Sequence, residues 1–365
     1  MRHASYALPV LLLVALTSGA APAPRFPSAA VWHQDISTAA THPDSTDMIA
    51  TLAKVGGWGN SNRMQIDFSL HVRQLAPGES APRHPVIAHR IYGDYYLPDC
   101  EPLGSTMPVP VDAAFEGNTG LACDNAAADC HLIVVEGQTL YELYAGNLQD
   151  GVLDAMCLAV WDLAPVYPPQ GRGEHCTSAD AAGFPIAPLL PNADGVAAAM
   201  AQPDGDLGHA IRFILPNNRM ASDASLGGFA GRLYVRPASH AGSHSGPVGS
   251  VPYGARLRLR ADFDMSGYND AARVILRTMQ RYGIVLADGG NIALTFESDR
   301  HTGTTWAALG ITSHVFWSGS DGNHSPVKVT DFSVIDTGPR IAETYDCVRT
   351  PIVPEQGLFR DGFEA

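Results

Sequence analysis

Alternation of polar and apolar residues recurs in short runs along the chain and predicts a protein built mainly of β-strands. Residues 65–72 and 255–263 show it most clearly, because every second residue in these runs is apolar. Residues 131–135 and 139–144 are two further runs separated by a turn that contains Gly137. That arrangement is typical of a β-hairpin.

The same pattern continues over the rest of the chain, with one clear change of period. Residues 269–282 place apolar side chains at helical spacing, with Asn269 available as an N-cap and Gly283 as a stop. Further strands are expected at residues 158–163, 209–215 and 232–236, and a second hairpin at residues 284–296. Many short strands with one clear α-helix, at residues 269–282, indicate a mainly β fold of the β-sandwich or jelly-roll type.

The two ends of the chain differ from its middle. Residues 1–23 combine a charged start, a short apolar run and a small-residue end, as in a secretory signal peptide. The apolar run is too short for a membrane span. We expect an extended lead-in at residues 24–60, a single β-sandwich domain at 61–350 and a tail at 351–365. The expected location is therefore secreted or periplasmic.

Cysteine usage agrees with an oxidising compartment. The six cysteines form no CxxC pair, and an even number in an exported chain favours disulfides over metal ligation. Fifteen pairings are possible, and the spacing alone singles out only Cys123 and Cys130 as a candidate pair. The 36 glycines and 27 prolines fit a fold with many turns between short strands.

Charge and motifs exclude several classes of function. A formal charge of −14 disfavours nucleic acid as a partner, because nucleic-acid binding rewards basic patches. The sequence has no HExxH, GxSxG, P-loop or GxGxxG motif after a strand. We therefore expect no cofactor and no metal. His240 and His244 lie four residues apart, but in a Gly- and Ser-rich loop without a fixed face, so they are weak metal candidates.

Several longer motifs resemble an uncharacterised family of secreted bacterial proteins. They are Thr177-Ser-Ala-Asp-Ala-Ala-Gly-Phe-Pro-Ile186, His209-Ala-Ile-Arg-Phe213 and Arg281-Tyr-Gly-Ile-Val-Leu-Ala-Asp288, in this order. Residues 108–117 and the segment around His131 and residues 140–144 add to the likeness, which spans roughly residues 100–295. The resemblance implies secretion, and it carries no established activity.

Acidic side chains on apolar strands are the first candidates for chemistry. Glu142 lies between Tyr141 and Leu143, and Asp162 follows Trp161. Burying an ionised carboxylate without partners is costly, so each is expected in a cleft or paired with Arg. Two carboxylates about 5 to 9 Å apart would suit glycoside hydrolysis. Tyr144 and Trp161 could stack on sugar rings. The alternatives are an ion pair with Arg that only supports the sheet, and simple exposure to solvent.

Two acids in loops are further candidates. Asp180 lies in a run of small residues, which lets the backbone approach a ligand or another segment closely. Its alternative role is in a helix cap with Thr177 or Ser178. Glu116 precedes Gly117 and is a candidate substrate-binding acid or a turn residue. Asp288, before two glycines, is most simply a hairpin turn.

Histidines complete the set. His131 and His209 each begin a predicted strand, where an imidazole could act as a general base or donate to a substrate hydroxyl. Each could equally be a structural hydrogen-bond donor.

The sequence therefore predicts a secreted carbohydrate-active enzyme, either a glycoside hydrolase or a polysaccharide lyase, acting on a polysaccharide or another extracellular glycan. The alternatives are a noncatalytic protein that binds glycans or surfaces, and a cell-envelope protein. The candidate catalytic residues are Glu142, Asp162, Asp180 and His209. The candidate substrate-binding residues are Glu116, His131, Tyr144 and Trp161.

Overall fold

The computed structural model describes residues 26–123, 129–318 and 326–349. The expected signal peptide and C-terminal tail lie outside these residues. Five sheets account for the strands, and the mainly β prediction is confirmed. The expected helix is also confirmed as α4 (Asp270–Arg281), and the Asn269 side chain accepts a hydrogen bond from the backbone N–H of Ala272 at its N-terminus.

The largest sheet has six strands in the order β1-β15-β11-β14-β13-β16. Its pairs β1–β15 and β11–β14 are parallel, and the other pairs are antiparallel. Jelly rolls are antiparallel, so the finer jelly-roll topology is not established. The strands are β1 (Ile66–Leu70), β11 (Ile211–Leu215), β13 (Arg256–Leu259), β14 (Ile284–Gly289), β15 (Leu294–Glu297) and β16 (Phe332–Val334).

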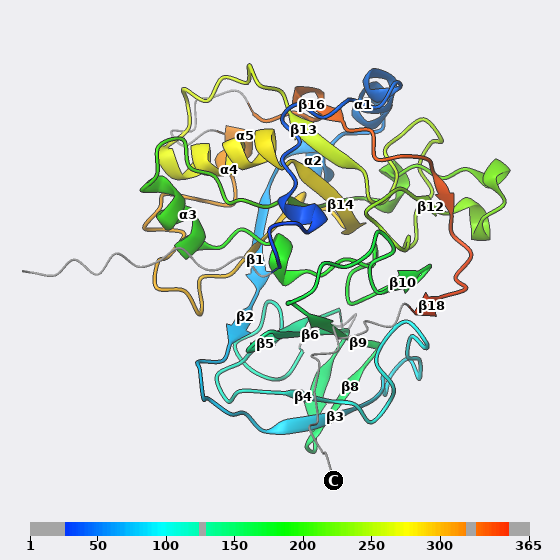
Figure 1. Ribbon diagram of the computed structural model, residues 1–365, viewed down its shortest axis with the longest axis vertical. Helices are drawn as coiled ribbons and strands as arrows, with labels where there is room; N and C mark the ends of the chain where they lie inside the picture. Colours follow the sequence, from blue (N-terminus) through cyan, green and yellow to red (C-terminus); the bar gives the residue numbers. More distant parts are fainter. Residues whose placement is uncertain (1–25, 124–128, 319–325, 350–365) are drawn as a thin grey trace, which may run out of the picture.

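Two four-stranded sheets form the other half of the molecule in Figure 1. The first has the order β2-β5-β6-β9, and its pair β5–β6 is the hairpin expected around Gly137. The second has the order β4-β3-β8-β7. The strands are β2 (Val72–Gln74), β3 (Arg83–Ala88), β4 (Thr106–Pro108), β5 (Leu132–Glu136), β6 (Thr139–Tyr144), β7 (Asn147–Gln149), β8 (Val152–Ala155) and β9 (Cys157–Asp162).

Short helices and two-stranded sheets complete the fold. The other α-helices are α1 (Ser45–Lys54), α2 (Gly59–Asn62), α3 (Ala193–Met200) and α5 (Val315–Ser318). The small sheets pair β10 (Gly173–Glu174) with β18 (Val348–Arg349), and β12 (Leu233–Tyr234) with β17 (Ile341–Ala342). The segment expected as an extended lead-in contains α1, because Met48, Ile49 and Leu52 recur at helical spacing and are buried.

The expected hairpin at residues 284–296 is wrong. β11 lies between β14 and β15 in the sheet, so the chain after β14 crosses over β11 instead of folding back on itself. Residues 284–287 are buried throughout, as in a central strand with partners on both sides. The turn-forming residues Asp288-Gly289-Gly290 therefore end a central strand.

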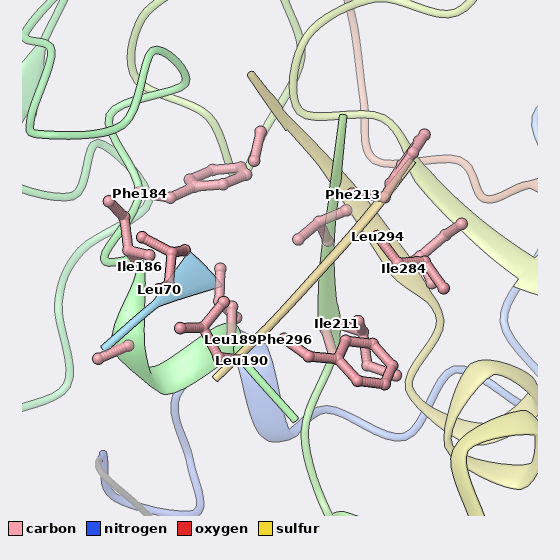
Figure 2. Close-up of a cluster of buried hydrophobic side chains, with 14 of the residues drawn as sticks. Leu70, Phe184, Ile186, Leu189, Leu190, Ile211, Phe213, Ile284, Leu294 and Phe296 are labelled. Atoms are coloured by element: carbon pink, nitrogen blue, oxygen red, sulfur yellow. The ribbon is translucent and has the colours of Figure 1, made fainter. Parts of the chain in front are cut away.

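The loop between β9 and α3 packs against the six-stranded sheet. Figure 2 shows Phe184, Ile186, Leu189 and Leu190 of this loop among apolar side chains of β1, β11, β14 and β15. These side chains belong to one buried apolar cluster that also includes Leu140 and Leu158 of the first four-stranded sheet. The loop thus joins the two halves of the molecule through a shared core.

Three disulfides support this arrangement. Cys123 pairs with Cys130, which confirms the one pairing that spacing suggested. Cys100 pairs with Cys157, and Cys176 pairs with Cys347. The last bond ties the β9–α3 loop to the end of the described chain.

Candidate active site

A cavity of about 740 Å³ lies where the two halves of the molecule meet. Its lining comes from residues 94–99, the end of β6, residues 177–181, residues 229–243 and the end of β14. We call it the acidic cavity because five aspartates line it, whereas Arg232 is its only Lys or Arg among the residues that the structure describes. The aspartates are Asp94, Asp99, Asp129, Asp180 and Asp288.

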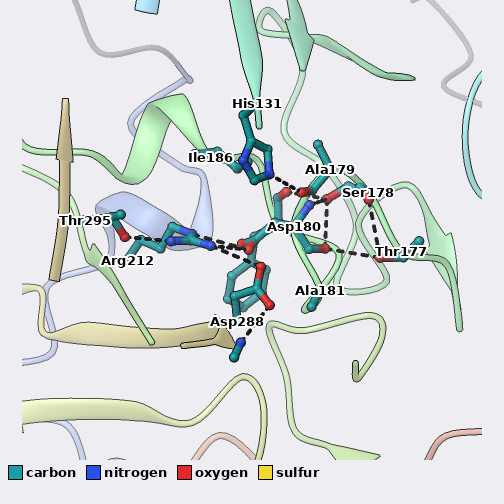
Figure 3. A network of polar contacts seen from close by, with 12 residues as sticks. His131, Thr177, Ser178, Ala179, Asp180, Ala181, Ile186, Arg212, Asp288 and Thr295 are labelled. Atoms are coloured by element: carbon teal, nitrogen blue, oxygen red, sulfur yellow. Dashed lines mark hydrogen bonds and ion pairs between the residues drawn. The ribbon is translucent and has the colours of Figure 1, made fainter. Parts of the chain in front are cut away.

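Arg212 is the centre of the polar network at the cavity floor (Figure 3). Its Nη2 donates to Asp180 Oδ1 at 2.8 Å and to Asp288 Oδ2 at 3.3 Å, and its Nη1 donates to Thr295 Oγ1 at 2.6 Å. Two carboxylates that are far apart in sequence therefore share one guanidinium. Buried charges require such partners, and Arg212 is almost completely buried.

The sheet explains why these groups meet. Arg212, Asp288 and Thr295 belong to β11, β14 and β15, which are neighbours in the six-stranded sheet. The register of β11 and β14 shifts between Phe213 and Ile214, which pairs Ile214 with Asp288 at the end of β14. Such irregularities change the direction in which a side chain points.

Asp180 is held by the turn that its small neighbours allow. Ser178 Oγ accepts from Asp180 N at 3.0 Å and donates to the Phe184 carbonyl oxygen at 2.6 Å. Gly183 has φ +74°, and a Cβ there would lie 2.2 Å from Ser239 Oγ. The contact between Asp180 and Ser178 thus involves the backbone N–H of Asp180 and not its carboxylate. The Asp180 carboxylate instead accepts from Arg212.

Asp180 is the most perturbed carboxyl group of the cavity. Its side chain is fully buried, and its Oδ2 has no hydrogen-bond partner among the described residues. Burial raises the pKa of Asp180 to about 7, although the Arg212 guanidinium opposes the shift. The neighbouring Asp288 carboxylate favours the protonated form further. A carboxyl group in this state can release a proton near neutral pH.

Asp288 is the more accessible of the two carboxylates. About a quarter of its side chain is exposed (28%), and its Oδ1 accepts from Gly289 N at 2.6 Å. Because Asp180 and Asp288 contact the same Nη2 at 2.8 and 3.3 Å, these two oxygens are at most about 6 Å apart. The cavity therefore contains one buried and one accessible carboxyl group at close range.

Tyrosines form the other part of the lining. The rings of Tyr96 and Tyr144 stack with centroids 6.4 Å apart, and Tyr253 is almost completely buried. Burial and the neighbouring Asp129 raise the pKa of Tyr144. Burial and the carboxylates of Asp288 and Asp180 raise the pKa of Tyr253. These side chains therefore remain neutral hydroxyl donors.

Glu116 and His131 lie behind the cavity and support its wall. His131 Nδ1 contacts Glu116 Oε2 at 2.6 Å, and its Nε2 contacts the carbonyl oxygen of Ala179 at 3.0 Å. Despite burial, the Glu116 carboxylate raises the pKa of His131 to about 9. A protonated imidazole donates from both nitrogens, so the pair fixes the backbone next to Asp180.

Six of the eight sequence candidates do not line the cavity within the described residues, and they are Glu116, His131, Glu142, Trp161, Asp162 and His209. Glu142 is fully buried, where it accepts from the backbone N–H groups of Ile186 and Ala187 and from Trp161 Nε1. Asp162 is exposed, and its Oδ1 accepts from Ala164 N. His209 precedes β11, with its ring against that of His33. The acidic cavity thus brings together Asp180 and Tyr144 of the eight candidates.

Arg212, Asp288, Asp129 and Tyr253 line or support the site but were not among the candidates. The sequence does contain a signal for Arg212, because an arginine between Ile211 and Phe213 in an apolar strand needs a buried partner. Asp288 was read as a turn residue, since its partner lies 76 positions away.

His240 lines the cavity, and both His240 and His244 contact backbone groups. His240 Nδ1 contacts the Ala181 carbonyl oxygen at 2.6 Å, and burial lowers the pKa of His240 to about 4. His244 Nε2 accepts from Leu233 N. No cluster of three or more His, Cys, Asp or Glu side chains suited to a metal occurs within residues 26–123, 129–318 and 326–349.

Comparison with protein-family models, curated proteins and solved structures finds no match for this chain. Among its described helices, none has the length and apolar character needed to cross a membrane.

Proposed function

We propose that this protein is a secreted carbohydrate-active enzyme of the glycoside hydrolase type, with Asp180 and Asp288 as its catalytic carboxyl groups. The observation behind the proposal is that the two groups share Arg212 at the floor of a tyrosine-lined cavity. Three disulfides and the expected signal peptide support a role outside the cytoplasm.

The different environments of Asp180 and Asp288 indicate a different catalytic role for each. Asp180 holds a proton near neutral pH and would donate it from Oδ2 to the glycosidic oxygen as the bond to the anomeric carbon breaks. Asp288, held by Arg212, would form a covalent ester with the anomeric carbon. Water then attacks the anomeric carbon and breaks the ester, while ionised Asp180 accepts the proton of the water.

Spacing favours a retaining reaction. Retaining glycosidases place their carboxyl groups about 5 to 5.5 Å apart, whereas inverting enzymes need about 6.5 to 9.5 Å to admit a water molecule. The upper limit of about 6 Å between the Asp180 and Asp288 oxygens agrees with the shorter distance. The first product should therefore keep the anomeric configuration of the substrate.

The charge of the cavity disfavours the lyase alternative. Lyases act on uronic acids, whose carboxylate needs a cationic partner in the site. Arg232 is the only Lys or Arg lining this part of the described structure, against five aspartates. Neutral or cationic sugars fit this balance better than acidic ones.

A noncatalytic glycan-binding protein is the second candidate, because the Tyr96–Tyr144 stack alone could hold sugar rings. Incubation with a panel of polysaccharides, followed by measurement of new reducing ends, separates the two. The hydrolase proposal predicts product with retained configuration by NMR and a rate that falls above about pH 7, as Asp180 loses its proton. Binding without product on every glycan would contradict it.

A further inference from the structure

Several carboxyl groups of the acidic cavity have no cationic partner among the residues that the structure describes. Arg212 is matched by Asp180 and Asp288, so it offers no charge to the remaining carboxylates. Asp94, Asp99 and Asp129 form no ion pair with a residue that the structure describes. Asp94 and Asp99 instead accept from the backbone N–H groups of Tyr95 and Thr177. Burial raises the pKa of Asp99 and of Asp129, and a cation bound beside them would favour their ionised forms.

These carboxylates converge on the tyrosine stack. Burial and the charges of four aspartates raise the pKa of Tyr96, and those aspartates are Asp94, Asp129, Asp288 and Asp99. Tyr144, on the other side of the stack, hydrogen-bonds with Asp129. Aromatic faces next to carboxylates attract ammonium groups through both the ring quadrupole and the negative charge.

A second observation also indicates that the cavity is a ligand site. Asp180 is fully buried at its floor, and its Oδ2 has no hydrogen-bond partner among the described residues. Leaving a buried polar group unsatisfied costs about 1–3 kcal/mol, so a bound group that hydrogen-bonds with this carboxyl oxygen would recover that free energy. This observation is independent of the charge count and indicates that a ligand with hydrogen-bonding groups enters from the cavity.

We propose that the substrate is a glycan with free amino groups, such as a glucosamine polymer, and that its ammonium group binds beside Tyr96 and Tyr144, facing Asp129 and Asp94. The sugar hydroxyls and the glycosidic oxygen then face Asp180 and Asp288. The inference rests on the proposed function, because it assigns the substrate class of the same site. It also explains the single Arg232 in the lining, since further cations would repel such a substrate.

The test compares two ligands of equal length, a tetramer of glucosamine and a tetramer of N-acetylglucosamine, by calorimetry on the full chain. To prevent turnover, the titration uses Asp288→Asn, with the wild type at low temperature as a second measurement. The glucosamine tetramer should bind about tenfold more tightly. Its affinity should weaken between about 0.1 and 1 M salt, as the Debye length falls from about 10 to 3 Å.

A further variant tests the location of the ammonium group. Asp129→Asn should weaken glucosamine-tetramer binding by about three- to tenfold and leave the acetylated tetramer unaffected. Asp150→Asn is the matched control, because Asp150 is exposed (81%) on a turn outside the cavity lining and should change neither affinity. Equal binding of both tetramers, or no binding of the glucosamine tetramer, would overturn the proposal.

The outcomes also separate this inference from the proposed function. Hydrolysis of an uncharged glycan that depends on Asp180 and Asp288, with equal binding of both tetramers, would refute only the ammonium preference. Salt-sensitive binding of the glucosamine tetramer without product would support the ammonium site and refute the hydrolase.

Discussion

At the scale of single residues, Arg212 is the feature on which the site depends. Its guanidinium joins Asp180, Asp288 and Thr295, which come from a loop and two strands. The run of small residues around Asp180 makes it a candidate from the sequence alone. The sequence does not show that Arg212 is its partner. Arg212 is 32 positions away, and only the folded sheet brings the two together.

Arg212→Met should destabilise the protein by about 3–5 kcal/mol at pH 8, because it leaves two buried or half-buried carboxylates without their cation. The loss should be smaller at pH 5, where Asp180 can take up a proton. Urea unfolding at the two pH values measures the difference. Arg260→Met is the control and should cost less than about 1 kcal/mol, because the Arg260 side chain is half-exposed (52%) and its pairs with Asp262 and Asp331 are long, at 3.4 and 3.5 Å. Equal losses in the two variants would contradict the account.

The Glu116–His131 pair gives a second prediction, with the opposite dependence on pH. The pKa of His131 is raised to about 9 in the folded protein, against 6.5 for the free side chain. Its contribution to stability is therefore fully present below about pH 6.5 and disappears as the pH rises through about 9.

Unfolding free energies of the wild type and His131→Gln should therefore differ most at pH 6 and converge above about pH 9. His84→Gln, at a half-buried histidine in β3 without a carboxylate partner among the described residues, serves as the control variant. A difference that stays constant between pH 6 and pH 10 would refute the charged pair.

At the scale of elements, the loop between β9 and α3 positions the site. Glu142 of β6 holds this loop by accepting from Ile186 N and Ala187 N. Local patterns predicted β5, β6, β9 and α4, because their periodicity and turns lie within short windows. They failed for residues 284–296, where the pairing of β14 with β11 depends on residues some 70 positions apart.

The loop contact should be visible in the pH dependence of stability. Burial raises the pKa of Glu142 to about 7, against 4.5 for the free side chain, so folding favours its protonated form. Its contribution therefore declines as the pH rises from about 4.5 to about 7. Glu142→Gln removes this titration, and its unfolding free energy should fall less than that of the wild type over this range. An unchanged slope would contradict the assignment.

At the scale of the whole molecule, one buried apolar cluster unites the two halves around the acidic cavity, and Cys176–Cys347 ties the β9–α3 loop to the end of the described chain. Composition predicted the disulfide-bearing, strand-rich class correctly, because cysteine number and turn residues are global properties. It could not predict the parallel pairs of the six-stranded sheet, since these follow from crossovers that no local pattern records. The resemblance to a secreted bacterial family stays a prediction.

The disulfides should contribute unequally. Cys176–Cys347 spans 171 positions, whereas Cys123–Cys130 spans 7. In the chain-entropy model, their removal costs about 5 and about 2 kcal/mol respectively. Urea unfolding of the two double serine variants tests this order. A larger loss for the short loop would contradict a role of Cys176–Cys347 in fixing the β9–α3 loop.

The central claim is that Asp180 and Asp288 act together on a glycan, and turnover in three single variants tests it most directly. With the glycan that gives most product, Asp180→Asn and Asp288→Asn should each lower kcat by about a hundredfold or more. Circular dichroism should confirm that both variants fold, and Asp150→Asn should keep the wild-type rate. Wild-type turnover in folded Asp288→Asn or Asp180→Asn would contradict the claim.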